Sequence, residues 1–247
     1  MCPTVAVQNW SRNYKICRIT SSAPVVASAS SDRTGPVGRS LAAQRLTAKG
    51  ERTRQSILVA ASELIFEQGL AGATIEDVQA AANVSASQLY HYFPSKTALV
   101  RAVIKFQEDG VVGAQEQALA DLGTLDGLRA WADAVVDVQR QLRCRGGCPI
   151  GSLGSQLAET DPETRFDIAA SFQRWADAIR DGLRSMQASG YLTASASPDD
   201  LALALLAALQ GGFLLGQVQR STRPLRIALD AILALIATHA AFPSSEA

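Results

Sequence analysis

The chain has few of the residues from which metal centres, disulfide frameworks and most catalytic sites are built. Its 247 residues include two histidines and four cysteines, Cys2, Cys17, Cys144 and Cys148. The cysteines are not evenly spaced, so we expect reduced thiols in a cytoplasmic protein. No histidine lies near the last two, which argues against zinc. We also find no phosphate-binding glycine loop and no nucleophile with a base, and we therefore expect no metal, no cofactor and no enzyme.

Aromatic residues are also scarce, at 6%, and neither sign of charge prevails over the whole chain. The abundance of Ala and Leu favours helix throughout, so we expect an all-α fold in one or two domains. The charge is unevenly distributed: residues 1–105 hold 12 Lys and Arg against 6 Asp and Glu, and residues 106–247 hold 11 against 17. A positive first part suits a polyanionic partner, although a chance fluctuation would give the same pattern.

Residues 1–45 are rich in Ser, Ala, Thr and Gly and have no sustained hydrophobic period. We interpret them as a mostly disordered leader. Polar and charged residues between Trp10 and Arg18 interrupt any apolar core that a secretory signal would need. The basic residues of this segment either add DNA affinity that does not depend on sequence, or belong to a solvated leader or an over-extended gene start.

Hydrophobic periodicity predicts helices through the rest of the chain. Their approximate ranges are 49–68, 75–82, 86–93, 95–122, 125–143, 161–190, 198–218 and 224–242. Gly110 and Gly113 lower helix propensity, so the fourth of these helices is expected to bend or fray there. Residues 143–156 are glycine-rich and are predicted to form a loop, with at most a short helix around Leu153.

The segment 74–97 reads as two short helices and the start of a third. Thr74 is expected to cap the first helix, with Asp77 three residues on. Asn83 tolerates the left-handed backbone of a tight turn, and Ser85 is expected to cap the second helix. At 100° per residue, Leu89 and Phe93 fall on one side of that helix, which we predict to be buried.

The other side of the second helix is polar. Ser87, Gln88 and His91 project away from the buried side, and Tyr90 and Tyr92 flank them. Hydroxyl, amide, imidazole and phenol groups on one helix suit the base edges and phosphates of a DNA major groove. Lys96 follows in the first turn of the next helix, where a phosphate would lie.

These residues resemble the helix-turn-helix of TetR-type transcriptional regulators. The resemblance rests on the Val84-Ser85 turn, the run 89–93 (LYHYF) and the exit 94–96 (PSK). The chain departs from the common pattern with Asn83 in place of Gly, and with Ala86 and Ser87 in place of a basic residue and Gly. Ala86 has no donor for a guanine contact, so Gln88 is the expected base reader, suited to adenine.

The resemblance implies a DNA-binding domain at residues 46–97 and a helical ligand-binding and dimerisation domain at 98–247. It implies a homodimer on a near-palindromic operator, with repression favoured over activation. Basic residues at the start of the first helix either contact phosphates or form an ordinary solvated helix start. The residues predicted to meet DNA are Arg52, Thr74, Ser85, Ala86, Ser87, Gln88, Tyr90, His91, Tyr92 and Lys96.

The helices predicted at 198–218 and 224–242 are apolar nearly all round. Such helices belong to a large core, an oligomer interface or a membrane. Glycines and Gln210 in the first, and Arg226 and Asp230 in the second, argue against a membrane. The resemblance implies instead a four-helix bundle with the same two helices of a second subunit. A membrane-associated helical protein is the alternative of a different class.

The regulatory part is expected to bind a small-molecule effector between its helices. Trp131, Phe172 and Trp175 are candidates to line that pocket, and the alternative for each is plain core. Cys148 lies in a run, 147–151 (GCPIG), that resembles a cysteine-bearing loop in some TetR-type sensors of electrophiles or oxidants. Neighbouring arginines, at positions 143 and 145, are expected to lower the pKa of its thiol. The alternative for Cys148 is a buried small hydrophobe.

Overall fold

The computed structural model describes residues 46–113, 115 and 123–240. In this part of the chain the regular structure is helical, apart from an isolated bridge between Leu192 and Ala240. The α-helices are α2 (Ala48–Gly72), α3 (Ile75–Ala82), α4 (Ala86–Tyr92), α5 (Lys96–Glu108), α7 (Leu125–Gln141), α8 (Pro149–Leu157), α9 (Pro162–Ala188), α10 (Pro198–Gln219) and α11 (Arg223–Thr238). The all-α prediction is confirmed. The leader predicted at residues 1–45 lies outside the described residues.

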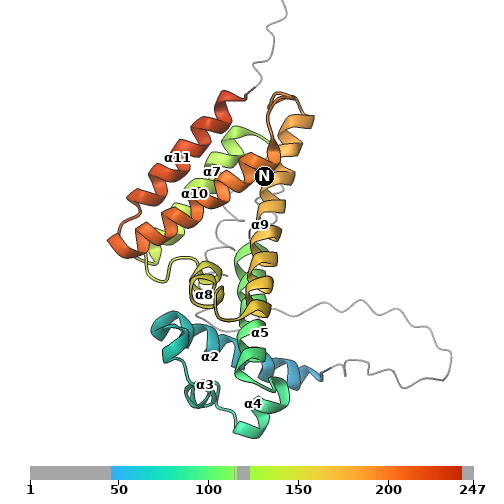
Figure 1. Ribbon diagram of the computed structural model, residues 1–247, viewed down its shortest axis with the longest axis vertical. Helices are drawn as coiled ribbons and strands as arrows, with labels where there is room; N and C mark the ends of the chain where they lie inside the picture. Colours follow the sequence, from blue (N-terminus) through green and yellow to red (C-terminus); the bar gives the residue numbers. More distant parts are fainter. Residues whose placement is uncertain (1–45, 114, 116–122, 241–247) are drawn as a thin grey trace, which may run out of the picture.

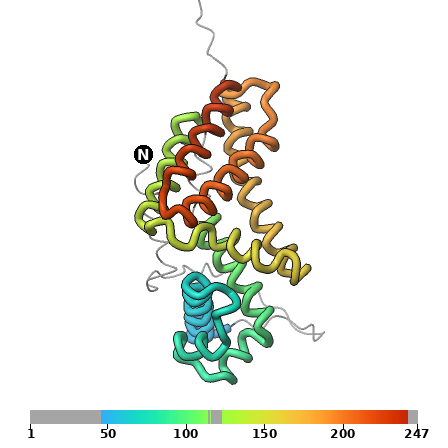
Figure 2. Tube along the Cα trace, turned by 60° about the vertical axis from the view of Figure 1, so that its left-hand side comes forward, coloured from blue at the N-terminus to red at the C-terminus, as the bar shows by residue number. Residues whose placement is uncertain are grey.

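The helices form two bodies, which Figure 1 and Figure 2 show from two directions. A small body at one end contains α2, α3 and α4. A larger one contains α7, α9, α10 and α11, and α5 and α8 lie where the two meet. The predicted domain boundary near residue 97 falls in the first turn of α5, so α5 extends from the DNA-binding candidate into the larger body.

The small body forms around apolar residues at helical spacing. Ile57 and Leu58 of α2, Val78 of α3 and Leu89 of α4 are all buried, with at most 3% of their surface exposed. Gly69 has a φ of +74°, which interrupts α2 near its end. The first helix was predicted to end at residue 68, and the backbone does leave helical geometry at the next residue, Gly69. Helical turns then resume as far as Gly72.

The single helix predicted at 95–122 is not observed as one regular α-helix. α5 ends at Glu108 and is followed by a π-helical turn, Asp109–Gly113, which contains both glycines of this region. Glycine lowers the cost of departing from α-helical geometry, and π turns commonly interrupt helices in this way. Residues 114 and 116–122, which the same prediction covered, lie outside the described residues.

The loop predicted at 143–156 is shorter than expected. Residues 142–148 connect α7 to α8, and the regular helix α8 occupies Pro149–Leu157. Proline at the first position of a helix needs no hydrogen-bond acceptor and has the required φ. Ile150 and Leu153 are buried on one side of α8, so packing overcomes the low helix propensity of Gly151 and Gly154.

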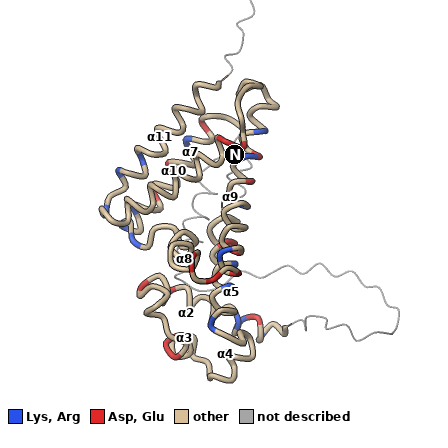
Figure 3. The backbone as a smooth tube through the Cα atoms, in the orientation of Figure 1, with Lys and Arg blue, Asp and Glu red and all other residues tan. Residues whose placement is uncertain are grey.

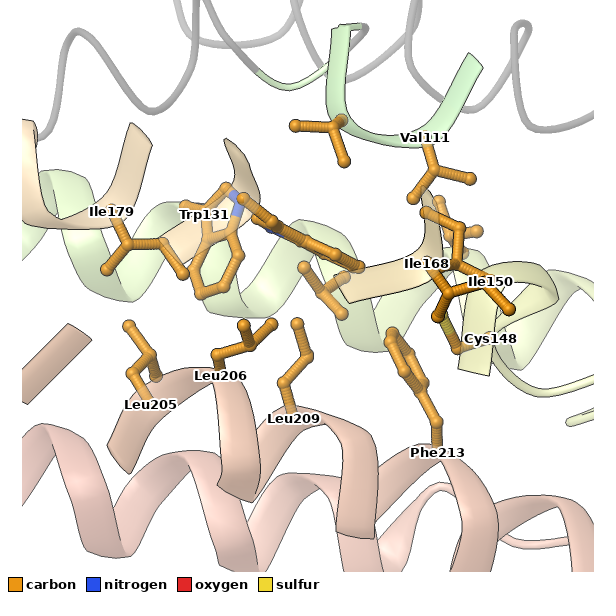
Figure 4. Close-up of a cluster of buried hydrophobic side chains, with 14 of the residues drawn as sticks. Val111, Trp131, Cys148, Ile150, Ile168, Ile179, Leu205, Leu206, Leu209 and Phe213 are labelled. Atoms are coloured by element: carbon orange, nitrogen blue, oxygen red, sulfur yellow. The ribbon is translucent and has the colours of Figure 1, made fainter. Parts of the chain in front are cut away.

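The larger body is organised around α9 and the α10–α11 pair. One side of α9 is buried, at Ile168, Trp175, Ile179, Leu183 and Met186. α10 and α11 lie side by side (Figure 1). Side chains from α7, α9 and α10 and from the start of α8 form the cluster in Figure 4, including Trp131, Cys148, Leu209 and Phe213.

α10 is the one helix in the described residues that is long and apolar enough to cross a membrane by length and composition. The core helix of a soluble protein has the same character. In the structure one side of α10 is buried within the chain, at Leu201, Leu205, Leu209 and Phe213. The last residues of the helix predicted at 224–242 lie outside the described residues, and α11 ends at Thr238.

Candidate DNA-binding surface and regulatory core

The start of α3 and the turn between α3 and α4 have the geometry that their residues predict. The Thr74 hydroxyl accepts a hydrogen bond from the Asp77 amide at 3.1 Å, and the Asp77 carboxylate accepts one from the Thr74 amide at 3.3 Å. Asn83 is left-handed, with a φ of +53°. The bonds at Thr74 fix where α3 begins, and the left-handed Asn83 fixes where it ends and therefore the direction in which α4 leaves.

The first turn of α4 is closed by a second pair of reciprocal bonds. The Ser85 hydroxyl accepts from the Gln88 amide at 3.2 Å, and the Gln88 side-chain oxygen accepts from the Ser85 amide at 2.9 Å. Gln88 thus has a structural role besides its predicted base contact. The Ser-x-x-Gln spacing at 85–88 carries this signal in the sequence, and our sequence reasoning missed it.

α4 has the two faces that its periodicity predicts. Leu89 is fully buried and Phe93, just after the helix, is 2% exposed. Tyr90 is 49% exposed. Ser87, Gln88 and His91, which were predicted to project outward, are also exposed, as is Ala86. The structure therefore brings the predicted polar residues of α4 together on one solvent-facing surface.

Two predicted contact residues on the flanks are also engaged within the domain. Tyr92 is half-buried, and its hydroxyl lies 3.4 Å from where a Cβ at Gly50 would be, at the start of α2. The Lys96 ammonium donates a hydrogen bond to the Ala73 carbonyl at 3.0 Å. An ammonium group has three N–H donors, so this bond leaves Lys96 with donors for a phosphate while fixing α5 to the α2–α3 turn.

The basic residues at the start of α2 differ from one another. Arg52 is exposed. The Arg54 guanidinium instead lies 5.6 Å from the centre of the Phe93 ring and 3.8 Å from Glu51. Arg54 therefore packs over the end of α4, and Arg52 is the better candidate for a phosphate contact.

One connection between the two bodies is an ion-pair network between α5 and α9. Arg101 of α5 contacts Asp167 at 2.5 Å and Glu163 at 2.7 Å. About two turns further along α5, Glu108 accepts hydrogen bonds from Lys105, Arg174 and Ser171. Burial opposes ionisation of Glu108, but these donors outweigh it and lower its pKa from the usual 4.5 to about 2. The carboxylate is thus charged at neutral pH and holds α5 to α9.

A second connection joins α2 to α8 and to the loop before it. The Leu70 amide donates to the Gln156 side-chain oxygen at 3.2 Å. The Phe66 ring lies directly over Gly146, where an added Cβ would come within 1.6 Å of a ring carbon. Gly146 also has a φ of +80°. A change in this loop therefore reaches α2 directly.

The aromatic residues predicted to line an effector pocket lie in the core of the larger body. The Trp131 indole donates to the Gln115 side-chain oxygen at 3.0 Å. Trp175 is 1% exposed, and its indole N–H has no acceptor in the described residues. The side-chain amide nitrogen of Gln210 is also buried, and its amide group lies against the Cys148 sulfur. Phe172 is half-buried and packs against the same cluster.

The expectation of a lowered thiol pKa at Cys148 is wrong. The side chain is 6% exposed, and burial raises the pKa of the thiol. The sulfur caps α8 by accepting a hydrogen bond from the Gly151 amide at 3.4 Å, and Gln210 also contacts it. The neighbouring arginines at 143 and 145 do not offset the burial, because both side chains are exposed to solvent. The structure thus favours the alternative, a buried small side chain at a loop–helix junction.

Large apolar side chains are exposed on the outer faces of α10 and α11. Six of them are between 47% and 72% exposed: Leu203, Leu214, Leu215, Val218, Ile227 and Leu235. A soluble monomer rarely exposes so many on adjacent elements. The outer face of α10 and α11 that carries these six side chains is therefore a candidate protein interface.

Comparison with protein families matches both parts of the chain. Residues 57–103 match the family described as bacterial regulatory proteins, tetR family. Residues 124–231 match the C-terminal domain of LmrA/YxaF-like transcriptional regulators. The first match covers the α2–α5 region and the second covers the larger body.

Curated relatives and solved structures agree with these matches. The transcriptional regulator AcuR of Cereibacter sphaeroides is 27% identical over 173 residues, which cover 69% of this chain and 79% of AcuR. The HTH-type transcriptional repressor DhaR of Mycobacterium sp. (strain GP1) is 26% identical over 209 residues, covering 78% and 94%. A crystal structure of a regulatory protein TetR from Rhodobacter sphaeroides superposes with a TM-score of 0.67 at 25% identity, covering 74% of this chain and 97% of that one.

Proposed function

Since the chain belongs to the TetR family of transcriptional regulators, we propose that it is a ligand-responsive repressor that binds a near-palindromic operator as a homodimer. The observation that carries the proposal is α4, a capped helix with one buried face and one exposed polar face. A helix of this kind enters a major groove with its first turns against the base edges. The protein would act in the cytoplasm, on double-stranded DNA, without a cofactor, an enzymatic step or a membrane.

Within α4, Ser87 and Gln88 stand in the first turn and would face the bases. The hydrogen bond that Gln88 makes in the cap competes with a hydrogen bond to a base. Bidentate pairing with adenine needs both the oxygen and the nitrogen of the side chain, and the oxygen is already bonded to the Ser85 amide. Gln88 therefore either reads one base through its nitrogen alone or gives up the cap on binding.

Phosphate contacts would come from the edges of the same surface. Arg52 supplies an exposed guanidinium, Lys96 two remaining ammonium donors, and Tyr90 an exposed hydroxyl. Thr74, Ser85, His91 and Tyr92 complete the proposed contact set. These groups orient the helix, whereas the first turn of α4 selects the sequence.

The homodimer is supported by the exposed apolar face of α10 and α11. Pairing this face with its copy would remove the six large side chains from water and form a four-helix bundle. Two copies of α4 would then lie about 34 to 36 Å apart, which is one turn of DNA.

An effector would bind in the core of the larger body and change that spacing. Trp175 supports this, because its buried indole N–H has no acceptor in the described residues. Buried donors without acceptors are costly, and a ligand oxygen would satisfy them. Binding there would reach α4 through the α5–α9 ion pairs and the α2–α8 contact. We take binding as the signal rather than reaction at Cys148, whose thiol is buried.

Selection of bound fragments from random duplex DNA, at near-physiological salt, tests the central proposal. A two-fold-symmetric motif is the expected outcome. If the selection recovers no motif and DNA binding disappears as the salt concentration rises, sequence-specific recognition is contradicted. A reporter gene behind the recovered motif then decides between repression, which the name of DhaR favours, and activation.

Substitutions in α4 and α5 separate base reading from phosphate binding. Gln88→Ala is expected to relax preference at one position of each half-site. Lys96→Ala is expected to weaken binding to all DNA sequences equally and to make the affinity depend less on salt concentration. Gln88→Glu is the matched control for the cap, because it keeps the oxygen that accepts from the Ser85 amide. Identical behaviour of the Gln88 and Lys96 variants would contradict the division of roles.

A lysine on the outer face of α10 tests the dimer. Leu214→Lys places a charge in the middle of the proposed interface, so we expect a monomer in sizing chromatography and no operator binding. Phe166→Lys is the control, since Phe166 is 76% exposed but lies on α9. An unchanged dimer for Leu214→Lys would place the interface elsewhere.

A further inference from the structure

We propose that a cleft between the end of α7 and the α10–α11 turn is a binding site for a compact anion with two or more negative charges. The cleft has a volume of about 700 Å³. Its walls carry Arg140, Arg143, Arg145 and Arg220, with Ser221 and Thr222 beside them. We call it the basic cleft. It is separate from the DNA-reading face of α4 and from the apolar core around Trp175.

The charge in the basic cleft has little compensation. No acidic side chain lines it among the described residues. Arg140 pairs with Asp137 on its own helix, whereas the guanidinium groups of Arg143 and Arg145 have no acidic partner in the described part of the chain. Gathered guanidinium groups in a concave site attract anions and bind phosphate or carboxylate through paired N–H donors. In Figure 3 basic positions mark this end of the α10–α11 pair.

The backbone around the basic cleft is in an unusual conformation. The described residues include four non-glycine positions with positive φ, and three of them line the cleft: Arg143 (+52°), Cys144 (+52°) and Arg220 (+50°). Left-handed geometry is unfavourable for residues with a Cβ, and such positions gather at ligand-binding sites. Here the geometry turns two segments far apart in the sequence so that their arginines face one opening.

A hydrogen bond joins the two walls. Arg220 donates to the Cys144 carbonyl at 3.1 Å. Thr222, at the start of α11, makes no side-chain cap, and the Ser221 hydroxyl accepts a hydrogen bond from the Arg223 amide at 3.2 Å, so the positive end of that helix borders the cleft with a neutral hydroxyl rather than a carboxylate as its acceptor. A dianion held between the walls would therefore meet guanidinium groups from both and draw them together.

The basic cleft is connected directly to the DNA-binding domain. Gly146 follows Arg145 and lies under the Phe66 ring of α2. A shift of the 143–145 segment on anion binding would therefore press on α2 and move the helix-turn-helix. Binding of the anion stands by itself, whereas its effect on DNA rests on the proposed function.

Calorimetric titration of the full chain with inorganic pyrophosphate, and separately with citrate, tests the site at matched ionic strength. We expect saturable binding of one anion per subunit. The probe that binds more tightly assigns the natural ligand to phosphorylated compounds or to polycarboxylates. Absence of saturable binding with both probes would overturn the proposal.

The double variant Arg143→Gln, Arg145→Gln removes two exposed guanidinium groups without disturbing buried packing. We expect it to lower the affinity for the probe by about tenfold or more, because each lost contact is a charge-assisted hydrogen bond. Arg129→Gln is the matched control: Arg129 is an exposed arginine of α7 that pairs with Asp126 outside the cleft, and its loss should leave binding unchanged. An equal loss in both variants would mean adventitious surface charge only.

The same variants test the connection to DNA. Pyrophosphate or citrate is expected to change operator affinity of the wild type more than that of the double variant. If random-DNA selection recovers no operator, the proposed function fails while calorimetry still decides the site. If the double variant loses operator affinity without added anion, and calorimetry shows no probe binding, the arginines contact DNA and the small-anion site is overturned.

Discussion

The pairs α3–α4 and α10–α11 are each joined by three residues, 83–85 and 220–222, and each connection starts at a left-handed residue. Beyond this they differ. The first pair is fixed by bonds between near neighbours, such as the Ser85 cap, and leaves a polar face for another molecule. The second lacks a side-chain cap at Thr222 and is fixed by apolar contact along the helices. Local hydrogen bonds thus orient α4, the candidate DNA-contacting helix, whereas contacts between residues far apart in the sequence hold α10 and α11 together.

The largest effect should come from breaking the non-local contact. A Cβ at Gly212 of α10 would lie 2.7 Å from the Leu225 Cα of α11, which is backbone and cannot rotate away. Gly212→Val is therefore expected to destabilise the fold by about 3 kcal/mol. Urea unfolding at a fixed protein concentration measures this.

Gly211→Ala is the matched control for that variant. An added Cβ there meets no atom of this chain within 4 Å, so stability should stay unchanged or rise by up to about 1 kcal/mol. Equal destabilisation by the two variants would contradict the close contact at Gly212. Loss of the dimer in Gly211→Ala alone would place that glycine at the subunit interface.

A charged non-local contact should have the next largest effect. Glu108→Gln removes the carboxylate that binds Lys105, Arg174 and Ser171, and we expect a loss of about 2 kcal/mol at pH 7. The folded pKa is lowered, so the stabilisation is present above the usual pKa of 4.5 and is lost as pH falls through about 2. Unfolding free energies of wild type and variant should therefore converge between about pH 5 and pH 2. A constant difference over that range would contradict the assignment.

Removing a local bond should cost less stability but more function. Ser85→Ala deletes the hydroxyl that accepts from the Gln88 amide, with an expected loss of about 1 kcal/mol. Operator affinity should fall as well, because the first turn of α4 frays. Ser85→Asp retains a capping acceptor and should recover stability, but its negative charge faces DNA. Recovery of full affinity by that variant would mean that the first turn does not approach the phosphates.

The smallest effect should come from an exposed non-local ion pair. Arg226 of α11 contacts Asp133 of α7 at 2.5 Å, and both side chains are at least 34% exposed. Solvent screens such a pair, so Arg226→Gln should change stability by about 0.5 kcal/mol or less. Thermal unfolding at low and high salt checks this. A larger effect would show that exposed charges, as well as apolar contacts, hold α11 in place.

The helix-turn-helix was predictable residue by residue because its signals are local. The caps at Thr74 and Ser85, the turn at Asn83 and the buried Leu89 all depend on residues within four positions. The regulatory part was predictable only as helices. Helix α8 was missed because its glycines oppose helix, and the burial of Ile150 and Leu153 that favours it comes from distant segments. The packing of Arg54 over Phe93 was missed for the same reason.

Cys148 illustrates where local reasoning fails. Nearby arginines suggested a lowered pKa, yet the side chain points into the core and the arginines point into solvent. Desolvation then raises the pKa. Sequence proximity measures distance along the chain, whereas a pKa depends on distance and burial in space.

The sequence by itself determined the helical class, the order of the helices and the two faces of α4, because periodicity and capping act over one or two helical turns. Tertiary structure alone decided that Phe66 covers Gly146, that Glu108 joins α5 to α9, and that Arg220 faces Arg143 across a cleft. Each of these contacts joins residues more than 60 positions apart. Their partners are chosen by how whole helices pack, which no local pattern specifies.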